Sequence, residues 1–169
     1  MVLTKEELIA SLQNEVRILL HLAGKVDRSQ VDYRPTPTQR SILDLLQYLA
    51  IMGPTLIAVL RKGPADRAAF SAMWSPAEAA AKAMNFDQAV AAIEKQSGEY
   101  ARLLSEWTEA DFRADVDMFG RISSRGSLLV NLVLAGHAAY RTQLFCYLKS
   151  CGRDELNTMN LWAGMDGPA

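Results

Sequence analysis

The sequence lacks most of the residue patterns that would narrow its function. Only two histidines and two cysteines occur in 169 residues. There is no Cys-x-x-Cys, no His-Glu-x-x-His, no Gly-x-Ser-x-Gly and no glycine-rich phosphate loop. A metal site made of three histidines from one chain is therefore impossible, and the Glu-x-x-His pairs of di-iron bundles are missing too. The sequence alone names no catalytic residue.

An excess of basic charge is also absent. Lys and Arg number 18 against 19 Asp and Glu, for a net charge of -1. Nucleic acid is an unsuitable partner for such a chain, because phosphate neutralisation needs a basic surplus. No uninterrupted apolar run approaches the ~20 residues of a membrane span. The polar start Met1–Glu7 is also unlike a secretory signal.

The two cysteines give little reason to expect a disulfide. Cys146 and Cys151 are five residues apart in one predicted helix, so they point in different directions and are not expected to pair. We therefore predict a reduced, cytoplasmic protein that binds neither nucleic acid nor a membrane.

Helical periodicity dominates what is present. β-branched residues are sparse and no segment shows sustained strand alternation, so we predict an all-α fold. Four long amphipathic helices are expected, and they make a four-helix bundle of one domain, residues 1–169. Pro54 should kink the second helix or remove one of its backbone bonds. The four helices run from Thr4 to Gly24, from Thr38 or Ser41 to Gly63, from Asn85 to about Trp107, and from about Gly126 to Ser150.

The connections are too long for a minimal up-and-down bundle. We predict crossover loops that carry short helices, with one or two in the alanine-rich stretch 63–84. Ser75 would cap a helix there, with Pro76 at its first position. Residues 108–111 should form a short turn and residues 115–125 a loop.

The chain ends in a predicted tail, residues 153–169, that packs on the body through Leu161 and Trp162. His21 lies in the last turn of the first helix. An imidazolium there would be favoured by the negative end of the helix dipole, so we assign His21 a structural role.

Four residues are candidates for a site. Asp44 and Tyr48 share a face of the second long helix, and His137 and Arg141 share a face of the fourth. The small neighbours of His137 would leave its ring room in a cleft. Each pair also has a structural interpretation: Asp44 can cap the helix that follows Ser41, Tyr48 can be a core aromatic, and His137 can be buried and hydrogen-bonded to another helix.

Two segments resemble the DinB/YfiT-like proteins. Residues 34–50 resemble the proline-containing entry to that family's second helix, and residues 137–144, followed by Tyr147-Leu148-Lys149 and Gly152, resemble its C-terminal His-x-x-x-His helix. The resemblance implies a four-helix bundle with a non-sequential helix order and a homodimer. It also implies a divalent metal, often zinc or nickel, held by three histidines. Family members with known activities include thiol-dependent transferases.

This sequence departs from the family at the metal ligands. Tyr48 stands at the ligand position of the second helix and Arg141 at that of the second C-terminal histidine, so only His137 remains. Arginine repels a cation and has no lone pair to donate. We therefore expect no cofactor. Zinc or nickel held by Asp44, Tyr48 and His137 is the alternative.

Three functional hypotheses follow. The first is a metal-free DinB-like protein whose pocket, lined by Tyr48, His137 and Arg141, holds a small anionic ligand. In a purely structural version of it, Arg141 pairs with Asp44. The second is a thiol-dependent transferase or hydrolase with a remodelled metal site and a thiol ligand. The third is a dimeric interaction protein without a ligand.

Overall fold

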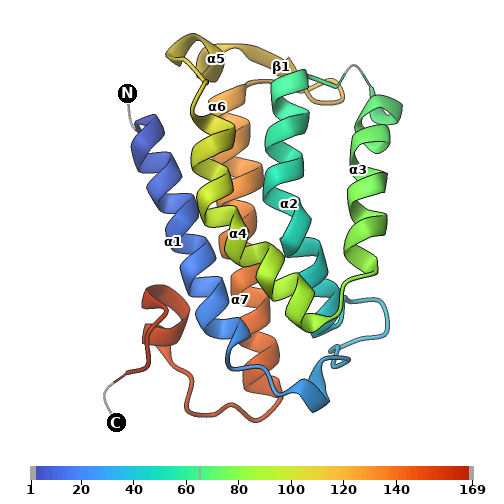
Figure 1. Cartoon of the computed structure of the whole chain (residues 1–169), viewed down its shortest axis with the longest axis vertical. Helices are drawn as coiled ribbons and strands as arrows, with labels where there is room; N and C mark the ends of the chain where they lie inside the picture. The colour runs from blue at the N-terminus through green and yellow to red at the C-terminus, as the bar shows by residue number, and fades with distance from the viewer. Residues whose placement is uncertain (1–2, 65, 168–169) are drawn as a thin grey trace.

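The computed structural model describes residues 3–64 and 66–167, and it is a four-helix bundle, as predicted (Figure 1). The third long helix, α4 (Phe86–Leu104), packs against both α1 (Lys5–Ala23) and α2 (Ile42–Lys62), and so does the C-terminal helical run. The first two helices therefore lie at opposite corners, in the non-sequential order that the resemblance implied. The bundle helices are α1 (Lys5–Ala23), α2 (Ile42–Lys62), α4 (Phe86–Leu104) and a run made of α6 (Arg125–Leu128), the π-helical segment η2 (Leu129–Leu134) and α7 (Ala135–Ser150).

Reciprocal caps fix where these helices begin. At α1 the Thr4 hydroxyl accepts from the backbone N–H of Glu7 at 3.1 Å, and the Glu7 carboxylate accepts from the Thr4 N–H at 2.7 Å. Ser41 and Asp44 form the same box at α2, so Ser41 and not Thr38 is the cap. Asn85 caps α4 in the same way. All three starts are confirmed, because a capping box depends only on residues three apart.

The predicted helix start at Ser75 is wrong. A single helix, α3 (Arg67–Lys82), spans the region and lies outside the four-helix core against α2 (Figure 1). Asp66 begins it, because its carboxylate accepts from the Ala69 N–H at 2.8 Å, two turns upstream of the predicted cap. Pro76 is thus an interior residue. It is exposed, so solvent can reach the carbonyl that it leaves unpaired.

A short hairpin replaces the predicted loop. Strand β1 (Asp115–Asp117) pairs antiparallel with β2 (Ile122–Ser124), beyond the short helix α5 (Glu109–Arg113). Phe119 and Gly120 both have positive φ, of 61° and 90°, as tight hairpin turns require. Three-residue strands are too short to show the alternation by which a strand is recognised in sequence.

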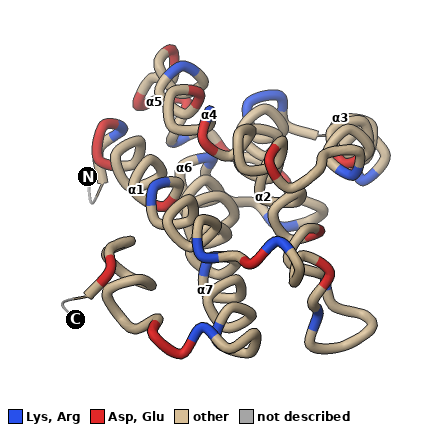
Figure 2. Tube along the Cα trace, turned by 60° about the horizontal axis from the view of Figure 1, so that its bottom comes forward, with Lys and Arg blue, Asp and Glu red and all other residues tan. Residues whose placement is uncertain are grey.

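Helix α2 supplies much of the core. It is long and apolar enough to meet a length-and-hydropathy test for a membrane span, which was not expected from the sequence. Just over half of its most apolar stretch is buried inside the bundle. Buried central helices of soluble bundles pass the same test, so the test does not distinguish a membrane-spanning helix from a core helix. Acidic and basic residues are mixed with each other along the chain (Figure 2).

The C-terminal segment folds back on the lower end of the bundle (Figure 1). Leu156 and Asn160 are its buried residues, and the π-helical turn η3 (Met159–Ala163) contacts α1. Leu161 is half-buried, but the predicted docking of Trp162 is wrong, since 68% of that residue is exposed.

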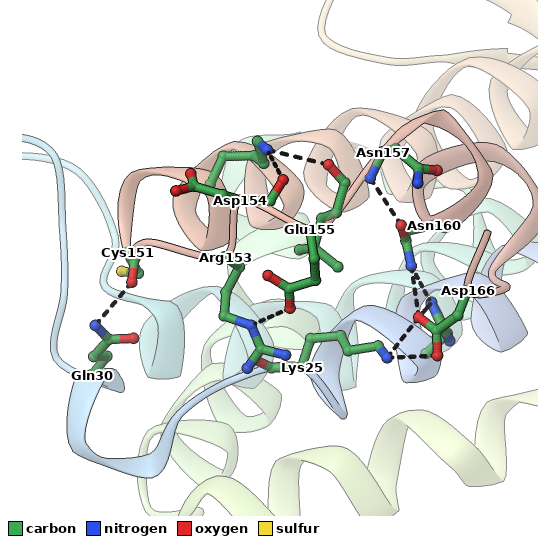
Figure 3. Close-up of polar contacts among 12 residues, drawn as sticks. Lys25, Gln30, Cys151, Arg153, Asp154, Glu155, Asn157, Asn160 and Asp166 are labelled. Carbon is green, nitrogen blue, oxygen red and sulfur yellow. Dashed lines mark hydrogen bonds and ion pairs between the residues drawn. The ribbon is translucent and has the colours of Figure 1, made fainter. Parts of the chain in front are cut away.

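Polar contacts hold this segment to α1 (Figure 3). The Asn160 amide accepts from the backbone N–H of Asn157, which leaves its NH₂ to donate to Asp166 at 2.9 Å and to Nε2 of His21 at 3.0 Å. Lys25 also donates to Asp166. Burial, followed by the charge of Lys25, lowers the pKa of His21. His21 therefore has the structural role that the sequence predicted, with its Nε2 accepting from Asn160.

Candidate functional site

The four candidate residues lie in three different surroundings. Asp44 and Tyr48 line a small cavity between α2 and α3, His137 is buried in the bundle core, and Arg141 contacts α1 and the C-terminal segment. The cavity that Tyr48 lines includes neither His137 nor Arg141. The three residues of the predicted pocket therefore do not share this cavity.

Tyr48 belongs to a line of aromatic rings that crosses from α7 to the hairpin. Its ring centroid lies 4.9 Å from that of Tyr140 on α7 and 5.8 Å from that of Trp74 on α3. Trp74 stacks on Phe70 at 5.8 Å, and Phe70 meets Phe119 of the hairpin turn edge-on at 5.7 Å. We call these five residues the aromatic row. It packs α3 against the bundle.

One arginine lies on this row at the mouth of the small cavity. The Arg40 guanidinium carbon is 4.1 Å from the centre of the Tyr48 ring and 5.8 Å from that of Tyr140, within cation–π range. Arg40 is exposed and forms no ion pair with any carboxylate of the described residues. The cavity has a volume of about 150 Å³ and is lined by Arg40, Asp44, Gln47, Tyr48, Ile51, Glu78, Ala81 and Lys82.

The other charges of this cavity are already paired. Asp44 accepts from the backbone N–H of Ser41 at 3.0 Å and from Arg34 at 3.1 Å. The Ser41 bond in particular lowers the pKa of this carboxyl, and the charge of Arg40 also contributes to lowering it. Glu78 and Lys82 face each other at 3.6 Å. The capping interpretation of Asp44 is therefore confirmed, and Arg40 is the cation left without a carboxylate at this site.

The Tyr48 hydroxyl is a neutral group at ordinary pH. Burial raises its pKa well above the usual value, and the neighbouring Tyr140 hydroxyl raises it further. Tyr48 can therefore donate a hydrogen bond to a ligand.

His137 is buried on the side of α7 that faces α4, with 1% of the residue exposed. Its Nε2 lies 2.5 Å from the Tyr100 hydroxyl of α4, and that hydroxyl donates to the Gln96 side-chain oxygen at 2.8 Å. The Gln96 amide nitrogen donates to the carbonyls of Leu49 and Ala50, both at 2.8 Å. We call Gln96, Tyr100 and His137 the buried polar chain.

The direction of this chain follows from its end at α2. Two carbonyl oxygens accept from Gln96, which fixes its nitrogen toward α2 and its oxygen toward Tyr100. Tyr100 has one hydroxyl hydrogen and uses it on that oxygen, so it accepts from His137. His137 must then carry its proton on Nε2. Its Nδ1 is a buried lone pair that meets no donor in the part of the chain that the structure describes.

Two residues of α2, Pro54 and Gly53, permit this arrangement. Pro54 has no N–H, so the carbonyl four residues earlier, on Ala50, lacks its helical partner, and Gln96 replaces it. Gly53 leaves space for the tyrosine, since a Cβ at this position would overlap the Tyr100 hydroxyl oxygen. The sequence identified Pro54 as a helix disturbance, but not the side chain that compensates for it.

His137 should make the bundle less stable in mild acid. Burial lowers its pKa to about 4, against an unfolded value near 6.5. Between these values the unfolded chain binds more protons, so stability falls as the pH falls. We expect a loss of about 2 kcal/mol from His137 between pH 7.5 and pH 5.

Urea unfolding of the wild type and of His137→Leu at several pH values would measure this contribution as the difference between the two pH dependences. Imidazole NMR gives an independent check. An Nε2-protonated ring that does not titrate down to pH 5 is expected, whereas a midpoint near 6.5 would contradict the buried neutral state.

Arg141 also has a structural position. Its side chain is 4% exposed and its Nε donates to the Glu15 carboxylate of α1 at 2.7 Å. It also donates to the Leu161 carbonyl and lies 5.6 Å from the ring of Trp162. The predicted pairing of Arg141 with Asp44 is wrong. Arg141 instead ties the C-terminal segment to α1.

The residues of α7 that face α2 lie one position earlier in the sequence than the predicted His137 and Arg141. Tyr140 meets Tyr48, and Gly136, four residues earlier, faces Met52, whose sulfur would lie 3.3 Å from a Cβ there. The α7 positions that face Tyr48 are thus 136 and 140. His137 and its neighbour at 141 are turned by about 100° toward α4 and α1, because each helical residue rotates by that angle.

This face therefore offers few metal ligands. It carries a glycine and a tyrosine on α7 opposite Tyr48, and the described residues contain no cluster of three or more His, Cys, Asp or Glu side chains arranged to hold a metal ion. Both cysteines are free, as predicted.

Sequence reasoning missed three residues that define these surroundings, namely Arg40, Gln96 and Tyr100. Gln96 and Tyr100 continue the buried face of α4 that includes Ala89 and Ile93. A glutamine in such an apolar stripe is a signal that a buried polar partner exists. Arg40 precedes its helix, and nothing in the sequence pattern indicates that it folds over Tyr48.

Comparison with known proteins supports the fold. No protein-family model matches the sequence, and no curated protein matches it. Among solved structures, the crystal structure of a DinB-like protein, YjoA, from Bacillus subtilis is similar, with a TM-score of 0.66 and 18% sequence identity. The match covers 89% of this chain and 94% of that one. The protein therefore has a DinB-like fold, as the sequence resemblance predicted.

Proposed function

We propose that this DinB-like protein is a binding protein for a small anion, such as a carboxylate, which it holds in the cavity beside Tyr48 without a metal ion. The observation that carries the proposal is the position of Arg40. Its guanidinium lies on two tyrosine rings at the cavity mouth and has no carboxylate partner among the described residues.

The chemistry of the cavity suits such a ligand. A guanidinium presents paired N–H donors that match a carboxylate or phosphate. Stacking on Tyr48 orients it, and the neutral Tyr48 hydroxyl supplies a further donor. A volume of about 150 Å³ is enough for an ion of a few heavy atoms, and it is small for a drug-sized ligand.

The remaining expectations stay predictions. These are the homodimer, the cytoplasmic location, the thiol ligand and the alternative of zinc or nickel. The hypothesis of a thiol-dependent enzyme calls for a nucleophile or a metal ion near Tyr48. The side chain beside Tyr48 that has no ion pair among the described residues is that of Arg40, which is neither.

Arg40→Gln should weaken anion binding at least tenfold, because a hydrogen bond to a charged group is worth about 1.5–3 kcal/mol. Trp74, whose ring lies 5.8 Å from that of Tyr48, is a built-in fluorescent reporter. Acetate, succinate and phosphate would be titrated separately at constant ionic strength.

Arg121→Gln is the matched control, because Arg121 is exposed and the substitution changes the net charge equally. It should leave the affinity unchanged, and Trp74→Phe should remove the signal. The proposal fails if no anion gives a saturable response, or if both arginine variants behave alike. Binding of one zinc or nickel ion per chain, lost in Tyr48→Phe, would also overturn it.

A further inference from the structure

A second, larger cavity lies at the opposite end of α1 from the C-terminal segment. It has a volume of about 690 Å³ and is lined by the start of α1, by α5 and by the start of the C-terminal helical run. These elements lie at the top of Figure 1. This volume is within the range of small-molecule sites. The lining of this cavity includes Leu3, Lys5, Leu8, Phe112 and Val130.

Apolar side chains from three elements converge in this cavity. Leu8 of α1 is buried, Phe112 of α5 is half-buried, and Val130 of η2 is 36% exposed. Leu3 adds to them from the segment before α1. The apolar part of the lining comes from residues distant in sequence, so the folded bundle forms it.

Most polar groups here already have partners. Arg113 donates to Glu109 at 2.8 Å, so this pair is neutral overall. Thr4 closes the helix cap described above, and the Asn131 amide donates to Ser127 at 3.2 Å. These groups add no net charge to the cavity.

Lys5 differs from them. Its ammonium donates to the backbone carbonyls of Ser105 at 3.0 Å and Trp107 at 3.3 Å, which fix its position. One of its three N–H donors remains, and it forms no ion pair with a carboxylate of the described residues. The cavity therefore combines an apolar lining with one positioned, uncompensated positive charge.

We infer that this cavity binds an amphipathic monocarboxylate, with its alkyl chain on Leu8, Phe112 and Val130 and its carboxylate at Lys5. Charge complementarity selects the head group, and the lining selects the chain. The site is separate from the cavity at Arg40, so either proposal can fail alone.

Calorimetric titration with hexanoate, octanoate and decanoate tests the alkyl part. Each added methylene should tighten binding about fourfold, since burying one is worth about 0.8 kcal/mol. Methyl decanoate, which has the chain without the charge, should bind at least tenfold more weakly than decanoate. Amide NMR shifts on adding decanoate should map to residues around Lys5, Phe112 and Val130.

Variants test the residues. Lys5→Met should weaken decanoate binding about tenfold and leave methyl decanoate unchanged, whereas Lys62→Met, an exposed lysine on α2, should change neither. Val130→Glu places a carboxylate in the lining at an exposed position and should weaken decanoate further. Absence of saturable binding, equal affinities for acid and ester, or shifts confined to another face would each overturn the inference.

Discussion

Gly53→Ala should destabilise the bundle by about 3 kcal/mol, which is the upper end of the range for overpacking a core. The added Cβ would overlap the Tyr100 hydroxyl oxygen and lie 2.8 Å from the ring carbon that bears it. Tyr100 cannot simply move aside, because it is fully buried and bonded to Gln96 and His137. Either the contact between α2 and α4 widens or the buried polar chain breaks.

Chemical denaturation measures this loss, and Gly98→Ala is its control. Gly98 is an exposed residue of α4, and no atom lies within 4 Å of the position that an added Cβ would take. Alanine there should therefore stabilise the helix by roughly 0.5–1 kcal/mol. The same substitution thus has opposite signs at the two glycines.

A double-mutant cycle identifies the clash. Tyr100→Phe removes the hydroxyl that the new methyl would strike, so Gly53→Ala should cost less in the Tyr100→Phe background than in the wild type. The relief is partial, because the ring carbons stay close. Equal costs in both backgrounds would show that Tyr100 is not the obstacle.

Local signals predicted where three of the main helices begin. Thr4, Ser41 and Asn85 each have their capping partner three residues away, so the motif is complete in the sequence. The order of the four helices came from the resemblance, and the solved DinB-like structure supports it.

The register of α7 against its neighbours could not be predicted from spacing. Four-residue spacing places His137 and Arg141 on one face of a helix, but it does not say which neighbouring helix that face meets. In the structure Tyr140 meets Tyr48, whereas His137 and Arg141 contact α4 and α1. One residue of register moves a side chain by about 100°, which is enough to account for this difference.

The partners of charged residues were also out of reach of the sequence. Arg141 pairs with Glu15, 126 residues away, and donates to a carbonyl of the C-terminal segment. No periodicity encodes a pair of that kind, because it depends on how the segment after α7 returns to α1.

Gln96→Leu should cost about 4 kcal/mol, the largest loss we expect from one substitution. Leucine fits the site in size but leaves the carbonyls of Leu49 and Ala50 without the donor that they share, and the Tyr100 hydroxyl without its acceptor. Each buried polar group left unpaired costs about 1–3 kcal/mol. Urea unfolding would measure the sum.

Pro54 gives this prediction a specific test. The Ala50 carbonyl needs Gln96 because Pro54 has no N–H to donate. Pro54→Ala restores that donor inside α2, so Gln96→Leu should cost at least about 1 kcal/mol less in the Pro54→Ala background. Gln47→Leu is the control: Gln47 also donates to a backbone carbonyl, that of Met84 at 2.7 Å, but that carbonyl lies outside α2.

The cost of Gln47→Leu should therefore be the same with proline or alanine at position 54. If Gln96→Leu also cost the same in both backgrounds, the glutamine would not be compensating for the proline, and the buried polar chain would be independent of Pro54. A coupling with Pro54→Ala that is seen for Gln96→Leu, and not for Gln47→Leu, would instead show that Gln96 compensates for Pro54. The proline of α2 would then be the reason that a glutamine occupies the core of α4, and through Tyr100 the reason that His137 holds its proton on Nε2.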